Sequence, residues 1–96
     1  MIQQVTITSE APVSLKPLIE GAIRAELKML ELGIARTQQR LAAFERQFGI
    51  STADFERRFN GQDLKETLEF IEWSGEIKML QLLQQKYQAL QGAQVS

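Results

Sequence analysis

The strongest constraint on the fold of this chain is one long helical pattern between Pro17 and Gly49. Apolar residues recur there at the alternating 4,3 spacing of a coiled-coil seam. The row consists of Ile23, Leu27, Leu30, Ile34, Thr37, Leu41, Phe44 and Phe48. The spacing predicts a helix over 15–48, about 50 Å long at 1.5 Å per residue. That length is several times the ~13 Å radius of gyration of a compact chain this size, so an equally long element must cover the seam.

The ends of this helix are marked by residues with known terminal preferences. Ser14 is placed to cap the N-terminus, and Pro17 fits only the first turn, where its missing N–H has no intrahelical partner. Gly49 follows the last apolar residue of the row, where a left-handed residue is expected. Gly33 lies beside the seam and costs the helix about 1 kcal/mol. The alternative is a break over 32–37 that gives two shorter helices.

Phenylalanines dominate the next part of the chain. Ser51 is predicted to cap a short helix, with Asp54 three residues on in a capping-box role. Two phenylalanines at i and i+4 share one face of this helix, which ends before Gly61. Residues 44–73 carry all five phenylalanines and the only tryptophan of the chain. We therefore predict that this region forms the core of a small helical module.

A third helix is predicted to be apolar on two sides. Asp63 is expected to cap it, and its pattern runs to about Gln91. One stripe consists of Trp73, Ile77, Leu80, Leu83, Tyr87 and Leu90. The other consists of Leu64, Leu68, Ile71, Met79 and Leu82, rotated well away from the first at 100° per residue. Because one antiparallel neighbour covers only one stripe, the other is expected to meet the short helix, a second subunit or a different protein.

A short N-terminal strand completes the predicted elements. Val5 and Ile7 lie on one face of the segment from Gln3 to Thr8, whose β-branched residues suit a strand. A lone strand is disordered, pairs with its copy in a second subunit, or adds to the sheet edge of a partner. The expected fold is all-α, a long helical hairpin with a short intervening helix. Its parts are an extended segment or strand at 1–12, a helical domain at 13–92 and a disordered tail at 93–96.

Composition removes most catalytic and metal chemistry from consideration. The chain has no cysteine and no histidine, so it lacks the nucleophiles, relays and soft ligands that most such sites use. Its formal net charge of -1 offers no basic field for nucleic acid, and no apolar run approaches the ~18 residues of a membrane span. We therefore expect a non-enzymatic cytoplasmic protein without cofactor, metal, membrane or nucleic-acid partner.

Two sets of residues are the candidates for binding. The partner-binding set joins the aromatic stripe to a row of acids that suits a basic partner: Trp73, Ile77, Leu80, Tyr87, Asp63, Glu66, Glu69 and Glu72. The same acids suit a solvated helix face, because carboxylates near the start of a helix favour its positive dipole end. The oligomer interface is predicted along the long helix, at Ile23, Leu27, Leu30, Ile34 and Leu41. The uncovered apolar surface predicts a homo-oligomer, as a dimer.

One segment carries a family resemblance. The run FERQFGIS at 44–51 is followed by two spaced phenylalanines, a glycine and FIEW at 70–73. It resembles small prokaryotic helical proteins with the pattern F-E-x-K-Y-G-M-[ST]-x-x-x-F-x-x-x-F, then a glycine, an acidic stretch and F-x-E-W. Many of these are similar to antitoxins of type II toxin–antitoxin modules. The likeness covers roughly residues 44–80. Gln47 and Phe48 depart from the basic residue and tyrosine that are commoner there, and the stretch after Gly61 is less acidic.

The resemblance implies an antitoxin-like protein that neutralises a small partner toxin, such as a ribonuclease, without being an enzyme itself. The aromatic stripe of the third helix is expected to dock on that partner, and the strand or the acids to complete or block the partner's site. Two alternatives stay open. One is a dimeric DNA-binding autoregulator that uses the N-terminal strand, and the other is a purely structural homodimeric coiled coil.

Overall fold

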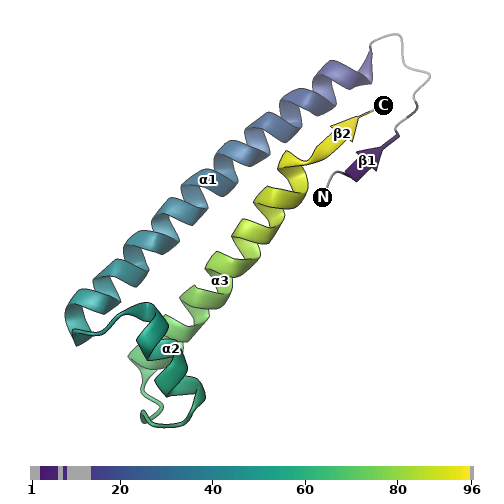
Figure 1. Ribbon diagram of the computed structural model, residues 1–96. Coiled ribbons are helices and arrows are strands. Elements are labelled where there is room, and N and C mark those ends of the chain that lie inside the picture. The colour runs from purple at the N-terminus through teal and green to yellow at the C-terminus, as the bar shows by residue number, and fades with distance from the viewer. Residues whose placement is uncertain (1–2, 7, 9–13, 96) are drawn as a thin grey trace.

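The structure, a computed structural model, describes residues 3–6, 8 and 14–95. Two long helices, α1 (Leu15–Phe48) and α3 (Leu68–Gln91), lie antiparallel, and α2 (Thr52–Asn60) closes one end of the pair (Figure 1). The molecule is a rod of 60 × 21 × 19 Å with a radius of gyration of 18.8 Å, whereas a compact chain of this length has ~13 Å. The predicted all-α hairpin is confirmed.

The helix α1 is continuous, so the alternative of a break over 32–37 is wrong. Gly49 ends it in the left-handed conformation, with φ of 70°, and donates its N–H to the carbonyl oxygen of Glu45 at 2.8 Å. At the other end Ser14 is extended, and its side chain makes no capping hydrogen bond. The hydroxyl group predicted to cap this helix is therefore not what starts it.

The seam of α1 is covered by α3 of the same chain. Leu30 and Leu41 are buried, and the other apolar residues of the row are half-buried. Thr37, the polar member of the row, is 3% exposed, and its hydroxyl donates to the carbonyl oxygen of Gly33 at 2.9 Å. A Cβ atom at Gly33 would meet Leu83 of α3 at 3.4 Å. Gly33 therefore lies at the contact between the two helices.

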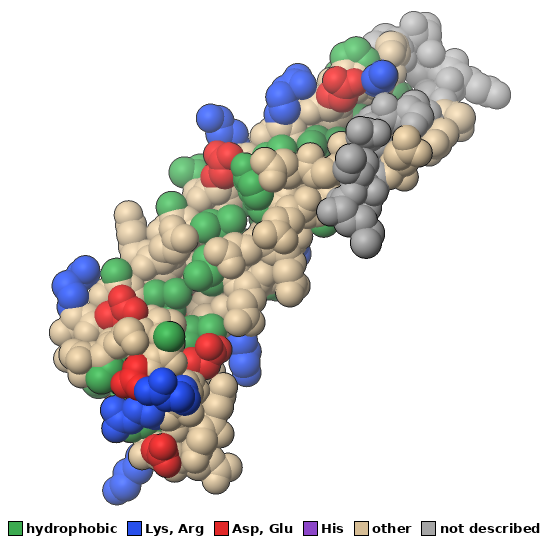
Figure 2. Space-filling view, viewed as in Figure 1, with side chains coloured by type: hydrophobic (Ala, Val, Ile, Leu, Met, Phe, Trp, Pro, Cys, Tyr) green, Lys and Arg blue, Asp and Glu red, His purple; other side chains and the backbone are tan. Residues whose placement is uncertain are grey.

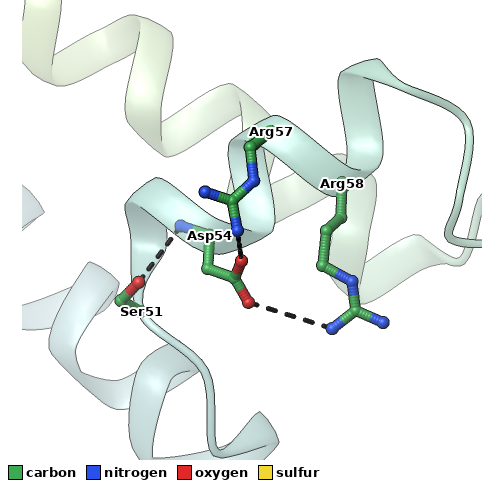
Figure 3. Close-up of polar contacts among 4 residues, drawn as sticks. All are labelled: Ser51, Asp54, Arg57 and Arg58. Carbon is green, nitrogen blue, oxygen red and sulfur yellow. Dashed lines mark hydrogen bonds and ion pairs between the residues drawn. The ribbon is translucent and has the colours of Figure 1, made fainter.

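The start of α2 is capped as predicted, but Asp54 has another role. The Ser51 hydroxyl oxygen accepts the N–H of Asp54 at 3.1 Å. The Asp54 carboxylate forms ion pairs with Arg57 and, at 3.9 Å, with Arg58 (Figure 3). Arginines three and four residues on lie within reach on the same helix face, so the carboxylate turns toward them instead of completing a capping box.

The helix α3 begins at Leu68, later than predicted, because Asp63 is not its cap. The backbone N–H of Asp63 donates to the carbonyl oxygen of Arg58 at 2.9 Å, which closes the turn after α2. Gln62, just before it, is left-handed with φ of 62°. The cap is Thr67, whose hydroxyl oxygen accepts the N–H three residues on at 3.1 Å. Residues 63–67 therefore cross from α2 to α3 outside either helix.

An aromatic cluster fills the end of the rod where the three helices meet. It contains Phe44, Phe48, Phe55, Phe59, Phe70 and Trp73. Phe55 and Trp73 have no exposed surface, and their rings stack in parallel with centroids 4.0 Å apart. The predicted phenylalanine-rich core is confirmed.

The N-terminal strand pairs within the chain. β1 (Gln3–Val5) lies parallel to β2 (Ala93–Val95), with Gln3 opposite Ala93. The hairpin makes this possible, because it brings both ends of the chain to the open end of the rod (Figure 1). The observed strand β1 is shorter than the strand predicted over 3–8. The tail at 93–96 was expected to be disordered, but its residues as far as Val95 form β2. The expectations for Ile7 and for residues 1–2, 9–13 and 96 lie outside the described residues.

Candidate protein-binding interface

The predicted docking stripe of α3 lies largely inside the molecule. Trp73 has no exposed surface and Ile77 is 8% exposed, while Leu80 and Tyr87 are half-buried. The Trp73 ring is covered by Phe55 of α2 and by the end of α1. The prediction that Trp73 and Ile77 bind a partner is therefore wrong, because both are buried in the core cluster, which α2 closes over Trp73.

One threonine ties α2 to both long helices. The backbone N–H of Thr52 donates to the Glu45 carboxylate of α1 at 2.6 Å. Its hydroxyl oxygen accepts the indole N–H of Trp73 from α3 at 3.2 Å. These two bonds satisfy polar groups that closing the aromatic cluster shields from water, so they hold α2 in place over the stripe.

The predicted oligomer interface on α1 is also used within the chain. Leu30 and Leu41 are 6% and 8% exposed, so they have almost no surface left for a second copy, and the prediction is wrong for these two residues. Ile23, Leu27 and Ile34 are half-buried on the same side of α1. For these three residues an oligomer contact stays a prediction.

Apart from Val5 of β1, the large apolar residues that are exposed in the described part of the chain lie elsewhere, on two helical faces. The α1 face consists of Leu18, Ala22, Ala25, Met29 and Leu32. The α3 face consists of Leu68, Ile71, Gly75, Met79 and Leu82. At 100° per residue each face points roughly 130° to 140° away from the side of its helix that packs on the other helix. Figure 2 shows hydrophobic side chains along the rod, with charged side chains at both of its ends.

Sequence reasoning missed the α1 face, although a signal for it was present. Leu18, Met29 and Leu32 are 60%, 64% and 60% exposed. The five positions of the face follow steps of 4, 3, 4 and 3 residues, which is a second seam-like row on the same helix. The two alanines make this row less apolar than the buried seam. The oligomer interface was therefore predicted at the seam and not at this row.

The α3 face has a glycine at its centre that the chain itself does not explain. Gly75 lies inside α3, where glycine costs about 1 kcal/mol relative to alanine. A Cβ atom at Gly75 would meet no atom within 4 Å. This is unlike Gly33, where a Cβ atom would be in van der Waals contact with Leu83. Among the described residues nothing packs closely enough on Gly75 to require a glycine.

The acids of the predicted partner-binding set are exposed, as that role needs. They are Asp63, Glu66, Glu69 and Glu72. Only Glu69 lies in the first turn of α3, so the predicted dipole benefit is confined to that residue. Binding of a basic partner by these acids stays a prediction.

A shallow hollow lies between α1 and α3 close to these acids. It is lined by Arg40, Ala43, Phe44, Gln47, Glu72 and Glu76. Arg40 and Glu76 form an ion pair across it at 3.1 Å. The hollow is thus lined by two acidic residues, one arginine and the apolar side chains of Ala43 and Phe44. Such an ion pair serves to hold the two helices in register, with the modest stabilisation typical of exposed ion pairs.

A hydrogen bond links the helices nearer the open end of the rod. The Tyr87 hydroxyl donates to the Glu31 carboxylate at 2.9 Å. This hydrogen bond, together with desolvation and the carboxylate's charge, raises the pKa of Tyr87 above its ordinary value of 10.0. Tyr87 therefore joins α3 to α1 and is not free to contact a partner through its hydroxyl.

The described residues hold no group of three or more His, Cys, Asp or Glu side chains able to bind a metal ion. No helix in the described ranges is long and apolar enough to cross a membrane.

The accessible surface of the chain is 7192 Å², whereas the size scaling of compact monomers gives roughly 5,600 Å² for this mass. The excess, roughly 1,600 Å², is about twice the ~800 Å² that each partner buries in a standard protein–protein interface.

Comparison with family models, with curated proteins and with solved structures found no match to this chain.

Proposed function

We propose that this chain is a non-enzymatic protein-binding module whose α1 face receives a partner protein. The observation that carries the proposal is the exposure of Leu18, Met29 and Leu32, each 60% or more. Single exposed apolar residues are ordinary on protein surfaces, but a row along about four helical turns is typical of an interaction site.

The spacing of the α1 face favours a helix as the docking element. Steps of 4, 3, 4 and 3 residues match the seam of a coiled coil. Ala22 and Ala25 are both exposed in the middle of the row, and their short side chains let a partner backbone come close. An amphipathic helix laid along such a row is a recurring mode of recognition.

The resemblance of residues 44–80 to antitoxin-like proteins supports a small toxin as the partner, neutralised in the cytoplasm. The exposed acids Asp63, Glu66, Glu69 and Glu72 support a partner with a basic surface, such as a ribonuclease. The DNA-binding alternative has less support, because Gln3–Val5 carries no basic residue and pairs with Ala93–Val95 of its own chain.

The test is co-purification of the tagged chain with the product of the neighbouring gene. The wild-type chain is expected to retain that product and to relieve its toxicity. Met29→Glu is expected to weaken retention about tenfold or more, because it places a charge in the row. Met79→Glu is the matched control, since it makes the same change at an exposed methionine on the other face, and it is expected to retain the product.

The proposed site is wrong if Met29→Glu and the wild-type chain retain the product equally. The proposed function is wrong if the wild-type chain does not bind the neighbouring product at all. Far-ultraviolet circular dichroism of each variant shows that its helices are intact, so that loss of binding is not loss of folding.

A further inference from the structure

We infer that the α3 face binds a second copy of this chain, with the two α3 helices crossing antiparallel at Gly75 on a twofold axis. The inference does not depend on the identity of the toxin-like partner, which is assigned to the α1 face. It rests on the glycine, on the symmetry of the face and on the area that the face exposes.

The glycine indicates close approach of an outside element. Gly33 shows the contrast within the chain: it faces α3, and a Cβ atom there would be in van der Waals contact with Leu83. Gly75 has the same unfavourable effect on its helix, yet it faces open space. Exposed apolar side chains lie four residues to each side of it, at Ile71 and Met79. A helix that crosses at Gly75 accounts for both the missing side chain and the apolar neighbours.

The spacing of the face indicates that this helix is another α3. Leu68, Ile71, Gly75, Met79 and Leu82 follow steps of 3, 4, 4 and 3 residues, so the face is symmetric about Gly75. A twofold interface requires such self-complementarity, because residue i must meet residue j and residue j must meet residue i. The α1 face, with steps of 4, 3, 4 and 3, has no such centre.

The symmetry defines the contacts in the dimer. Ile71 of one copy lies against Met79 of the other, Leu68 lies against Leu82, and the two Gly75 residues meet at the axis. Glu72 and Lys78, three residues before and after Gly75, are exposed at the rim of the face. Each copy therefore brings one charge of each sign to the rim, and the interface carries no net charge from this pair.

The exposed area is sufficient for a weak dimer. The four large side chains are 69%, 50%, 46% and 45% exposed, which corresponds to on the order of 400 Å² in each copy, within the range of the largest apolar patches on monomers. Two such faces with their polar rims approach the ~1,200 Å² lower bound of specific interfaces. Association is therefore expected at micromolar concentrations rather than as an obligate dimer.

Cysteine cross-linking tests the register directly, because the natural chain has no cysteine. Gly75→Cys is expected to form a disulfide-linked dimer under mild oxidation, since Cα atoms that meet at a crossing lie within the ~4.4–6.8 Å that a disulfide spans. Ile71→Cys alone and Met79→Cys alone are expected to cross-link poorly, whereas a mixture of the two variants forms the mixed dimer. The inference is overturned if Gly75→Cys cross-links no faster than Met29→Cys, or if Ile71→Cys links to itself as readily as Gly75→Cys does.

Gly75→Ala provides a second measurement that loss of folding cannot mimic. At concentrations where the chain is monomeric, the substitution is expected to raise Tm by about 5 °C, because alanine favours the helix. In sedimentation experiments it is expected to raise the dimer dissociation constant about tenfold, because the new methyl groups meet at the axis. Unchanged dimerisation in the more stable variant contradicts the crossing at Gly75.

The two methionine variants keep this inference separate from the proposed function. Met79→Glu is expected to abolish the dimer while the neighbouring product still binds, and Met29→Glu is expected to leave the dimer intact. Dimerisation of Met79→Glu at the wild-type concentration overturns the inference, whatever the outcome of the toxin experiment.

Discussion

At the scale of the residue, Trp73 anchors the most buried part of the molecule. Its ring has no exposed surface, stacks on Phe55 at 4.0 Å and donates to Thr52 at 3.2 Å. Trp73→Ala is expected to lower the free energy of unfolding by about 3–5 kcal/mol, a large share of the ~5–15 kcal/mol of a small domain. Trp73→Phe keeps a ring and loses the hydrogen bond, so we expect a loss of about 1–2 kcal/mol. Urea unfolding followed by circular dichroism measures both, and a change below about 1 kcal/mol for Trp73→Ala contradicts its burial.

Tyr87 reports on the contact between α1 and α3, and it is the only tyrosine of the chain. Its pKa is raised above 10.0, first by the hydrogen bond to Glu31. The folded state therefore holds this proton more tightly than the unfolded state does. The resulting stabilisation is complete below about pH 10 and is lost as the pH rises through the folded pKa. An ultraviolet titration of the tyrosinate is expected to have its midpoint above 10, and Glu31→Ala is expected to lower it. Equal midpoints for the two proteins would contradict the hydrogen bond.

At the scale of the element, the start of α3 gives a test that separates two capping residues. The Thr67 hydroxyl accepts the N–H of Phe70 at 3.1 Å, whereas the N–H of Asp63 closes the preceding turn. Thr67→Ala is expected to destabilise the protein by about 1 kcal/mol, and Asp63→Ala by less than about 0.5 kcal/mol, as for an ordinary surface site. Chemical denaturation measures both, and the reverse order of effects would contradict the observed helix start.

The elements that the sequence predicts well are those set by local patterns. The bounds of α1 follow from its apolar row and Gly49, and those of α2 from Ser51 and Gly61. The start of α3 is not decided locally, since Asp63 and Thr67 are both acceptable caps and the turn at Gln62 selects between them. The pairing of β1 with β2 joins residues at opposite ends of the chain, and it depends on the hairpin having formed.

At the scale of the whole molecule, the sequence predicts that one apolar stripe of α3 stays uncovered but not which one. The two stripes are similarly apolar, and only the position of α2 decides between them. Because α2 packs its phenylalanines on Trp73, the side with Leu68, Ile71, Met79 and Leu82 is the one left exposed. The same limit applies to the binding residues: the acids are exposed as predicted, whereas Trp73 and Ile77 of the set are core.

We propose that this rod exposes apolar faces that only a second molecule covers. Light scattering of the purified chain alone, over about 1–100 µM, tests it most directly. We expect the average mass to rise with concentration from 10.9 kDa toward twice that value, and the double variant Met29→Glu/Met79→Glu to stay at the lower mass. A wild-type chain that remains a folded monomer across the whole range would contradict this proposal.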